Sequence, residues 1–376
     1  MLFTLKTALL ALVLCCCFGL KSQAAAEDTL QTIKPKKKLS LTPFPALFSS
    51  PETGFGFGAL LVPVYNFGHD SLTRSSTGQF LVYYTTKKQT SAQLSYTIYT
   101  NHERFAILGE TNYFDAPIFY YGTGNRNSEA DKSLISYKLL LTQNRILKQL
   151  KRNVFLGGQF QIISVGKAEF NAEESLLDER PAEELNGYTA VGLGPAFLFD
   201  SRDNSINAYH GSYVEIGSFL NGKSLGSEFN FTRNTVDVRK YFPLSDKQVF
   251  AIQAKGIFET GDVPYRELAY FGGHRNLRGF YEGRYRDKQL LQTQAEYRLH
   301  FAKRHGAVLF AGLGEVGEKL NDFELANSKF GYGIGYRFML NTKDKVNIRI
   351  DYAIKGSYEA FAGGMGGLYF AIGETF

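Results

Sequence analysis

Cysteine is almost absent from this sequence. The 376 residues include three cysteines, Cys15 to Cys17, and all of them lie in an apolar stretch near the N-terminus. Once that stretch is removed, the chain has no thiol. It then has no disulfide framework, no cysteine nucleophile and no zinc–thiolate site, which excludes several classes of enzyme and of small secreted domain.

Long apolar runs are scarce as well. The stretch Ala8–Leu20 has thirteen residues, whereas a helix that spans a bilayer needs about 20. Lys6 precedes this stretch and small residues follow it. We therefore expect a secretory signal peptide over residues 1–26, cleaved near Ala24 or Ala26. An uncleaved membrane anchor is the alternative.

Strong charge of either sign is also missing. Removal of the expected signal peptide takes away Lys6 and Lys21 and no acid, so the net charge falls from +6 to +4. This balance gives no reason to expect a nucleic-acid partner. The remaining basic run, KPKKK, lies within residues 27–38, which we expect to form a solvated periplasmic tail.

Recognisable cofactor and metal sites are lacking too. No Gly-rich phosphate loop and no cluster of metal ligands occurs, so the sequence predicts neither a cofactor nor a metal. Asp200, Asp203 and Asn204 have oxygen ligands of the kind that calcium prefers. A turn at the end of a strand explains the same residues more simply.

Aromatic residues and glycine, by contrast, are abundant. The chain has 23 Tyr, 32 Phe and 38 Gly but no Trp, and its mean hydropathy is only −0.19. This combination is unusual for a soluble domain. It is typical of a barrel with lipid outside, water inside and aromatic girdles at both membrane interfaces.

Apolar and polar residues alternate with a period of two in many segments. In Ser91–Thr100, in Gln289–Phe301 and in Lys345–Ile354, large apolar side chains occupy one face and Gln, Asn or charged side chains the other. Such alternation predicts strands with one apolar and one polar face. A soluble antiparallel sheet would alternate in the same way. Segments of about ten residues are long enough to cross a bilayer when tilted, and they favour the membrane barrel.

The period predicts an all-β, transmembrane antiparallel β-barrel of sixteen strands over residues 39–376. An even number of strands closes the sheet and leaves no backbone edge facing lipid. We expect the long connections to lie outside the cell and the short turns in the periplasm. The long connections are near 113–132, 167–187, 261–287 and 317–327, and the strands start near residues 39, 54, 78, 90, 103, 133, 152, 188, 211, 227, 247, 288, 305, 328, 345 and 367.

The last segment, GLYFAIGETF, ends in an aromatic residue. Leu368, Phe370, Ile372 and Phe376 would share one face of a final strand. Such a strand resembles the signal by which the outer-membrane assembly machinery recognises barrel proteins, so Phe370, Ile372 and Phe376 are predicted to form that signal. An ordinary last strand is the alternative.

One long connection has no strand or helix period. It contains YFGGHRNLRGFYEGRYRD over residues 270–287, rich in Gly, aromatic rings and Arg. Leu277, Arg278, Gly279 and Phe280 resemble the Arg-Gly-Phe/Tyr loop of the BamA/TamA-like outer-membrane barrels, a superfamily that includes the bacterial surface antigen domain. The resemblance implies a loop that folds back into the lumen, where the Arg278 guanidinium would bind carboxylates.

The segments around this loop carry the same resemblance. Asp200, Arg202, Asp203 and Gly211 match the family's upstream strand pair, and Glu296 lies on the polar face of the strand that follows the loop. The match is specific over residues 190–376 and looser before them.

Two departures from the family pattern stand out. Gly312 occupies a position where the family usually has Asp, so Arg278 would pair with Glu296, or with Asp351 or Glu315. The family's periplasmic POTRA modules do not fit between the expected cleavage site and the first strand, which predicts a form without them.

The resemblance implies a barrel of a Gram-negative outer membrane that assists insertion or translocation of proteins or lipids. Its expected partners are outer-membrane lipid, the assembly machinery for its own insertion, and a separate periplasmic protein. Gly363, Gly364, Gly366, Gly367 and Gly373 would weaken the seam between the first and last strands.

Two other functions remain open. In a passive or substrate-specific porin, lumenal charges such as Lys255, Glu259, Arg337 and Arg349 would set ion selectivity. In an enzyme, His300 near Glu296 would be the candidate base, but the sequence has no matching Ser/His/acid set. We therefore predict that the chain is not an enzyme.

Overall fold

The computed structural model describes residues 39–50, 54–67, 73–128, 132–170, 185–357 and 365–376. The expected signal peptide and periplasmic tail lie outside these ranges, as do Gly363 and Gly364. Within them, no helix is long and apolar enough to cross a membrane.

Sixteen long strands and the two-residue β8 (Glu169–Phe170) form one antiparallel sheet. The alternating side chains explain why these segments extend, since each strand can present one face to lipid and one to the lumen. The long strands are β1 (Leu39–Ser50), β2 (Gly54–Tyr65), β3 (Ser76–Thr85), β4 (Thr90–Tyr99), β5 (Phe105–Tyr120), β6 (Ser133–Lys151), β7 (Val154–Val165), β9 (Tyr188–Asp200), β10 (Gly211–Asn221), β11 (Phe231–Ser245), β12 (Gln248–Gly261), β15 (Gln289–His300), β16 (His305–Gly317), β17 (Lys329–Asn341), β18 (Val346–Ser357) and β19 (Met365–Ile372).

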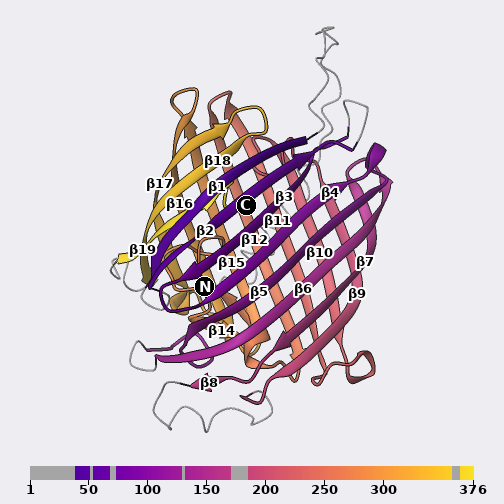
Figure 1. The fold of residues 1–376 in the computed structure, drawn as a ribbon, viewed down its shortest axis with the longest axis vertical. Coiled ribbons are helices and arrows are strands. Elements are labelled where there is room, and N and C mark those ends of the chain that lie inside the picture. Colours follow the sequence, from indigo (N-terminus) through magenta and orange to yellow (C-terminus); the bar gives the residue numbers. More distant parts are fainter. Residues whose placement is uncertain (1–38, 51–53, 68–72, 129–131, 171–184, 358–364) are drawn as a thin grey trace, which may run out of the picture.

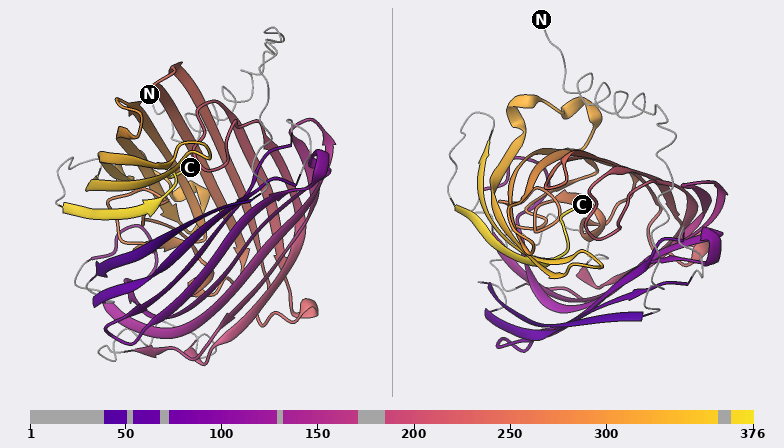
Figure 2. Two further views of the ribbon diagram at one scale, coloured as in Figure 1. Left: turned by 45° about the horizontal axis from the view of Figure 1, so that its top comes forward. Right: turned by 90° about the horizontal axis from the view of Figure 1, so that it is seen from above.

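Each long strand pairs with the next long strand along the chain, so the sheet is a simple meander. The strands tilt and curl around a central lumen (Figures 1 and 2). The prediction of an all-β barrel with sixteen strands is confirmed, and the predicted strand starts agree with the observed ones to within four residues.

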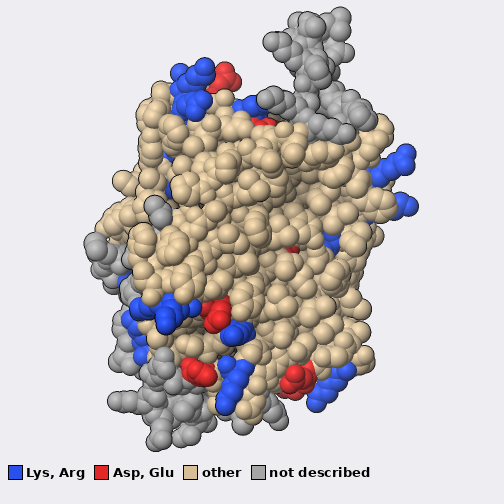
Figure 3. All heavy atoms as spheres, viewed as in Figure 1, with Lys and Arg blue, Asp and Glu red and all other residues tan. Residues whose placement is uncertain are grey.

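The outer surface is apolar. Outward side chains such as Ile146, Leu220 and Leu309 are about half exposed, while their neighbours along each strand are buried against the lumen. Figure 3 shows a broad uncharged band on one face, with most Lys, Arg, Asp and Glu gathered above and below it. Such a band suits contact with lipid tails.

The two ends of the barrel differ. One end, here called the loop end, carries the long connections 121–132, 166–187, 262–288 and 318–328. The other, the short-turn end, carries turns such as 152–153 and 246–247. The prediction that 113–120 belongs to a connection was wrong, because β5 continues to Tyr120 and pairs with β6 along its whole length.

The loop end is filled by an apolar core. Residues 262–288, between β12 and β15, enter the lumen with the 3-10 turn η4 (Tyr265–Glu267) and the hairpin of β13 (Ala269–Phe271) and β14 (Tyr285–Asp287). From this loop, Tyr265 and Leu268 pack against buried side chains of the wall, including Tyr120, Ile135, Tyr137 and Leu139.

The short-turn end is hollow. A cavity of about 880 Å³ lies there, lined by polar and charged side chains of the turns between β2 and β3, β4 and β5, β9 and β10, and β17 and β18. The loop end therefore holds packed apolar side chains, whereas the short-turn end holds a polar cavity.

The first and last strands are the edges of the sheet. β19 pairs with β18 over eight residues at most, and in the described part of the chain no ladder joins β19 to β1. The barrel thus has a seam between an edge strand that is twelve residues long and one that is eight.

Candidate functional site: a lumenal ring of charges

The loop that carries the Arg-Gly-Phe segment folds on itself before it meets the wall. Phe271, Phe280 and Tyr285 stack within it, with centroid distances of 5.4 to 5.9 Å, and Leu277 joins them in a buried cluster. Gly279 has φ of +113°, a conformation that side chains with a Cβ rarely adopt. The glycine therefore lets the chain turn just after Arg278.

Arg278 is buried, with 2% of its surface exposed. Its Nη1 donates to Asp351 Oδ2 and its Nη2 to Glu296 Oε1, both at 2.5 Å. Its guanidinium lies 3.5 Å above the centre of the Phe310 ring. Two carboxylates and an aromatic face thus stabilise the charge of this buried guanidinium, while its Nε has no hydrogen-bond partner among the described residues.

These contacts belong to a closed circuit that we call the lumenal ring: Arg278, Glu296, Arg298, Glu374, Arg337 and Asp351. Arg298 Nε donates to Glu296 at 2.8 Å, Arg337 Nη1 to Asp351 at 2.5 Å and Arg337 Nε to Glu374 at 2.8 Å. Arg298 and Glu374, 3.9 Å apart, close the circuit. Every carboxylate in it contacts at least two arginines, and the side chains are at most 3% exposed.

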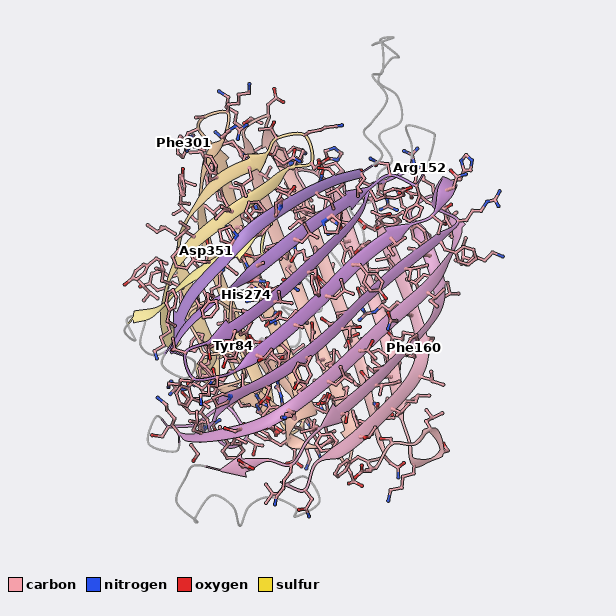
Figure 4. The ribbon with its side chains drawn as sticks, viewed as in Figure 1. Tyr84, Arg152, Phe160, His274, Phe301 and Asp351 are labelled. Atoms are coloured by element: carbon pink, nitrogen blue, oxygen red, sulfur yellow. The ribbon has the colours of Figure 1, made fainter. Side chains whose placement is uncertain are left out.

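A fourth arginine lies beside the ring. Arg349 Nη1 is 3.5 Å from Asp351 Oδ2 and also donates to the Thr375 hydroxyl, while Arg349 Nη2 donates to the His274 carbonyl at 2.8 Å. Figure 4 places His274 and Asp351 within the barrel. Burial, followed by the nearby arginines, lowers the pKa of His274 to about 3, so this loop histidine is neutral at neutral pH.

The structure distinguishes among the partners proposed for Arg278 at the sequence level. Glu296 and Asp351 contact it, whereas Glu315 instead accepts hydrogen bonds from Glu324 N and Ser328 Oγ. At Gly312, an added Cβ would lie 2.8 Å from Leu277 Cδ1. The glycine therefore leaves room for the loop's leucine where a larger residue would collide with it.

The loop also contacts the last strand. The backbone N–H of Gly279 donates to the Tyr369 hydroxyl at 3.0 Å, and that hydroxyl donates to the Phe280 carbonyl at 3.4 Å. Tyr369 points inward from β19, between the outward Leu368 and Phe370. Nothing in its alternating sequence context distinguished this tyrosine from other strand aromatics.

The chain turns inward after β19. Gly373 has φ of +76° and its N–H donates to Asn347 O, after which Glu374 N donates to Ile206 O at 3.2 Å. Although burial alone would raise it, the pKa of Glu374 is lowered because Arg337 and Arg298 stabilise its charge. Asn347 Nδ2 donates to its other oxygen at 2.5 Å.

The prediction that Phe376 shares one strand face with Phe370 and Ile372 was wrong. Phe370 is 56% exposed on the outer face, but Phe376 is 7% exposed and packs inside near Tyr241. Arg298 Nη2 donates to the Phe376 backbone oxygen at 3.1 Å. The strand ends at Ile372. Beyond it, Glu374 pairs with Arg337 in the lumenal ring, so the last residues lie inside the barrel and do not continue the strand.

A second group of charges lies at the short-turn end. This rim cluster consists of Arg74, Glu103, Asp200 and Arg202. Arg202 binds Asp200 through two hydrogen bonds of 2.9 Å, Arg74 binds Glu103 at 2.7 and 2.8 Å, and Arg74 lies 3.3 Å from Asp200. The cluster fastens the β9–β10 turn to the connection before β3. Arg74 had no distinguishing signal in the sequence.

The other upstream motif residues shape the same turn. Asp203 accepts from Tyr209 N at 2.8 Å, His210 N at 3.1 Å and Lys345 Nζ at 2.7 Å. Gly211 has φ of +107°, and a Cβ there would lie 2.3 Å from Ser201 O. In the described ranges no group of three or more His, Cys, Asp or Glu is arranged for a metal. The carboxylates of Asp200 and Asp203 instead accept hydrogen bonds from Arg202 and Lys345.

The charges assigned to a porin or an enzyme also have protein partners. Lys255 donates to Asn276 at 3.3 Å, and Glu259 accepts from Arg233 at 2.6 Å. His300 Nε2 lies 3.0 Å from the Tyr209 hydroxyl, while both oxygens of Glu296 bind arginines. Glu296 therefore does not orient His300.

Comparison with known proteins agrees with this architecture. A family model described as the Omp85 superfamily domain matches residues 68–376. No curated protein matches the sequence.

Two solved structures are similar. The first is BamA from Haemophilus ducreyi lacking POTRA domains 1–3, with a TM-score of 0.57 and 12% identity; 90% of this chain and 70% of that one are covered. The second is CdiB from Acinetobacter baumannii, with a TM-score of 0.54 and 11% identity; 89% of this chain and 59% of that one are covered. At such identities the likeness concerns the fold.

Proposed function

The chain belongs to the Omp85 superfamily, and on that premise we propose that it assists insertion or translocation of proteins or lipids at the outer membrane, with its lumen closed by the loop that carries Arg278. Barrels of this superfamily are outer-membrane proteins. The proposal includes a cleaved signal peptide over residues 1–26, a periplasmic tail over 27–38 and a barrel over 39–376.

One observation carries the proposal: the buried Arg278 between Glu296 and Asp351. A buried guanidinium that loses its carboxylates costs several kcal/mol, so the docked loop is a stable closed state with a defined release point. A permanently open pore does not require such a contact, whereas a barrel that stays closed when it is not transporting or inserting a client does.

The second support is the difference between the two ends of the lumen. The loop end is packed with apolar side chains, and the short-turn end holds a cavity of about 880 Å³. If the short turns face the periplasm, clients and a separate periplasmic partner approach the open end while the loop end prevents leakage. Lipid and the cell's own assembly machinery are the remaining partners that we propose.

Single-channel conductance in planar bilayers tests the closed lumen. We expect a small, intermittent current for the unaltered chain and a current at least severalfold larger for Arg278→Ala. Arg239→Ala is the matched control, because Arg239 is another lumenal arginine whose carboxylate, Asp237, lies two residues away on the same strand. A large steady current that Arg278→Ala leaves unchanged would make the chain a porin.

Assistance to clients needs a separate assay. Vesicles of outer-membrane lipid with and without the reconstituted chain would receive a urea-unfolded small barrel protein, and its folding would be followed by gel mobility. We expect faster folding with the chain present. Equal folding rates in both vesicle preparations would refute insertion of proteins as the activity.

A further inference from the structure

The last strand is held weakly within the sheet. β19 is the shortest of the sixteen long strands, and its ladder with β18 joins Ile348 to Ile372 at one end and Ile354 to Met365 at the other, with an irregularity before the last pair. Its other edge has no ladder partner in the described ranges. An edge strand of this kind depends on contacts other than its ladder to stay in place.

Those contacts come from inside the barrel. Tyr369 of β19 is bonded to Gly279 and Phe280, the two residues that follow Arg278. Just past the strand, Glu374 is bonded to Arg337 and lies in the lumenal ring. The loop therefore binds β19 near its middle, and the lumenal ring binds Glu374, just past the end of the strand.

The ring connects these two attachments. Asp351 accepts from Arg278 and Arg337, and Arg337 in turn donates to Glu374. If Arg278 leaves, Asp351 and Glu296 each lose one of their arginines. If Glu374 leaves with β19, Arg337 and Arg298 become buried arginines with one carboxylate fewer. Removal of either party raises the cost of keeping the other charges buried.

We propose that the loop and the last strand form one coupled unit, in which Tyr369 and Glu374 are positioning residues that let displacement of β19 release the Arg278 loop and release of the loop free β19. This inference rests on the proposed function, since it specifies how opening of the seam would release the loop that closes the lumen. Coupling of this kind is reciprocal, so each event must favour the other by the same factor.

Two readouts separate the coupling from the closed lumen itself. Residues 39–376 contain no cysteine, so pairs of introduced cysteines can be labelled cleanly. Spin labels at Leu41→Cys on β1 and Phe370→Cys on β19, both outward and exposed, report the seam as a distance distribution. Single-channel current reports the loop. Both measurements are made on the whole reconstituted chain.

We expect Glu374→Gln to add a long-distance population at the seam and to raise the open probability about tenfold, the factor expected for one charged hydrogen bond. Tyr369→Phe should do both to a smaller extent, about fivefold. Arg278→Ala should broaden the seam distance although it alters no residue of β19. Circular dichroism checks that every variant keeps its strand content.

Matched controls remove the same groups elsewhere in the lumen. Glu215→Gln loses a carboxylate that pairs with Arg145 at 3.0 Å, and Tyr96→Phe loses a hydroxyl bonded to Asn144. Neither should change the seam or the current. If the two controls change the seam distance and the current as strongly as Glu374→Gln and Tyr369→Phe do, general weakening of the barrel explains the effects and the coupling is refuted.

The failure modes differ. If Arg278→Ala raises the current but leaves the seam distribution unchanged, the closed lumen stands and the coupling is refuted. If Glu374→Gln and Tyr369→Phe widen the seam without changing the current, the coupling is refuted as well. If Arg278→Ala changes neither readout, the loop does not close the lumen, and the proposed function fails together with the inference.

Discussion

The molecule has two buried groups of arginines and carboxylates, and they hold different kinds of elements. The rim cluster joins residues of the wall and its turns: Asp200 and Arg202 are two residues apart, and Arg74 reaches Glu103 in the turn between β4 and β5. The lumenal ring joins the wall to a loop and to residues beyond the last strand. Similar ion pairs thus stabilise the wall and its turns at the rim, whereas in the lumen they join the wall to a loop and to residues beyond the last strand.

This difference teaches where a lost charge should be felt. The rim cluster holds parts of the wall that ladder hydrogen bonds also hold. A defect there is therefore expected to lower the free energy of unfolding without releasing a separate part. The loop's β13 and β14 form a small sheet of their own, and a single bridge joins Arg286 of β14 to Gly124 in another connection. A defect in the ring therefore releases a part that has no ladder to the wall strands. Each prediction below sets one change in the lumen or its loop against one at the short-turn end, where the rim cluster lies.

The largest effect is expected for Asp351→Asn. The change removes a charge that Arg278 and Arg337 share, and breaking such a buried network costs about 3–5 kcal/mol. We expect a strong rise in single-channel current. Asp200→Asn is the counterpart at the rim, where Arg74 keeps two bonds to Glu103. It should lower the midpoint of unfolding by guanidinium chloride and leave the single-channel current unchanged. An equal rise in current for both variants would contradict the distinction between ring and rim.

Glycine replacements should give the next largest effects. Gly211→Ala at the rim combines φ of +107° with a Cβ 2.3 Å from Ser201 O, for a cost of about 2–4 kcal/mol. Gly312→Ala in the lumen brings a Cβ to 2.8 Å from Leu277 Cδ1 and to 3.1 Å from Gln294 Cβ and Thr293 O, for about 1–3 kcal/mol. Unfolding in detergent should show the first and conductance the second. The reverse pattern would contradict the assignment of the two regions.

These comparisons also show how far the sequence could predict the structure. The period of two identified all sixteen strands, because lipid outside and a wet lumen inside impose the same alternation on each of them. It failed where strands leave the membrane. The alternation of apolar and polar residues changes parity between residues 229 and 241, a pattern that predicts a bulge. β11 nevertheless pairs regularly there, and its irregularity falls between Pro243 and Ser245. Beyond the apolar band, an outward Asn234 is simply solvated.

The site was predictable in part. The Arg-Gly-Phe resemblance singled out Arg278, but Glu296, Asp351 and Glu315 were all possible partners, since all lie on inward faces of strands. The stagger of neighbouring strands decides which carboxylate reaches the loop, and periodicity does not contain the stagger. The inward turn at Gly373 was missed for a related reason, because one positive φ overrides the alternation that placed Phe376 on the same face as Phe370 and Ile372.

Acid should affect the lumen before it affects the rim. The pKa of His274 is lowered to about 3 in the docked loop, against about 6.5 in a solvated one. Protonation therefore opposes docking: its stability is complete above pH 6.5 and falls with the pH below that value, by up to tenfold per unit. We expect the current to rise between pH 7 and pH 5, and His274→Gln to remove this rise.

Asp203 provides the contrast at the rim. Burial would raise its pKa, but Lys345 and the N–H groups of Tyr209 and His210 lower it below the usual value of about 3.9. A carboxyl with a lowered pKa contributes stability above its unfolded pKa and loses it as the pH falls below that value. The rim should therefore weaken only below about pH 4, as measured by unfolding. A rise in current confined to that range, and unaffected by His274→Gln, would contradict the role of His274.

The smallest effect should come from single hydroxyls. Phe119 N donates to the Tyr281 hydroxyl at 3.1 Å, one of the contacts that fasten the loop to the loop end, and Tyr209 makes the corresponding contact with His300 at the rim. Tyr281→Phe and Tyr209→Phe should each cost about 1 kcal/mol or less.

In the lumen, such a change alters the balance between docked and released loop by up to about fivefold, so the dwell time of the closed state should shorten for Tyr281→Phe. At the rim, the same loss is spread over a wall held by many ladder bonds and should leave the dwell time unchanged. Equal shortening in both variants would mean that the rim, too, holds a separable part.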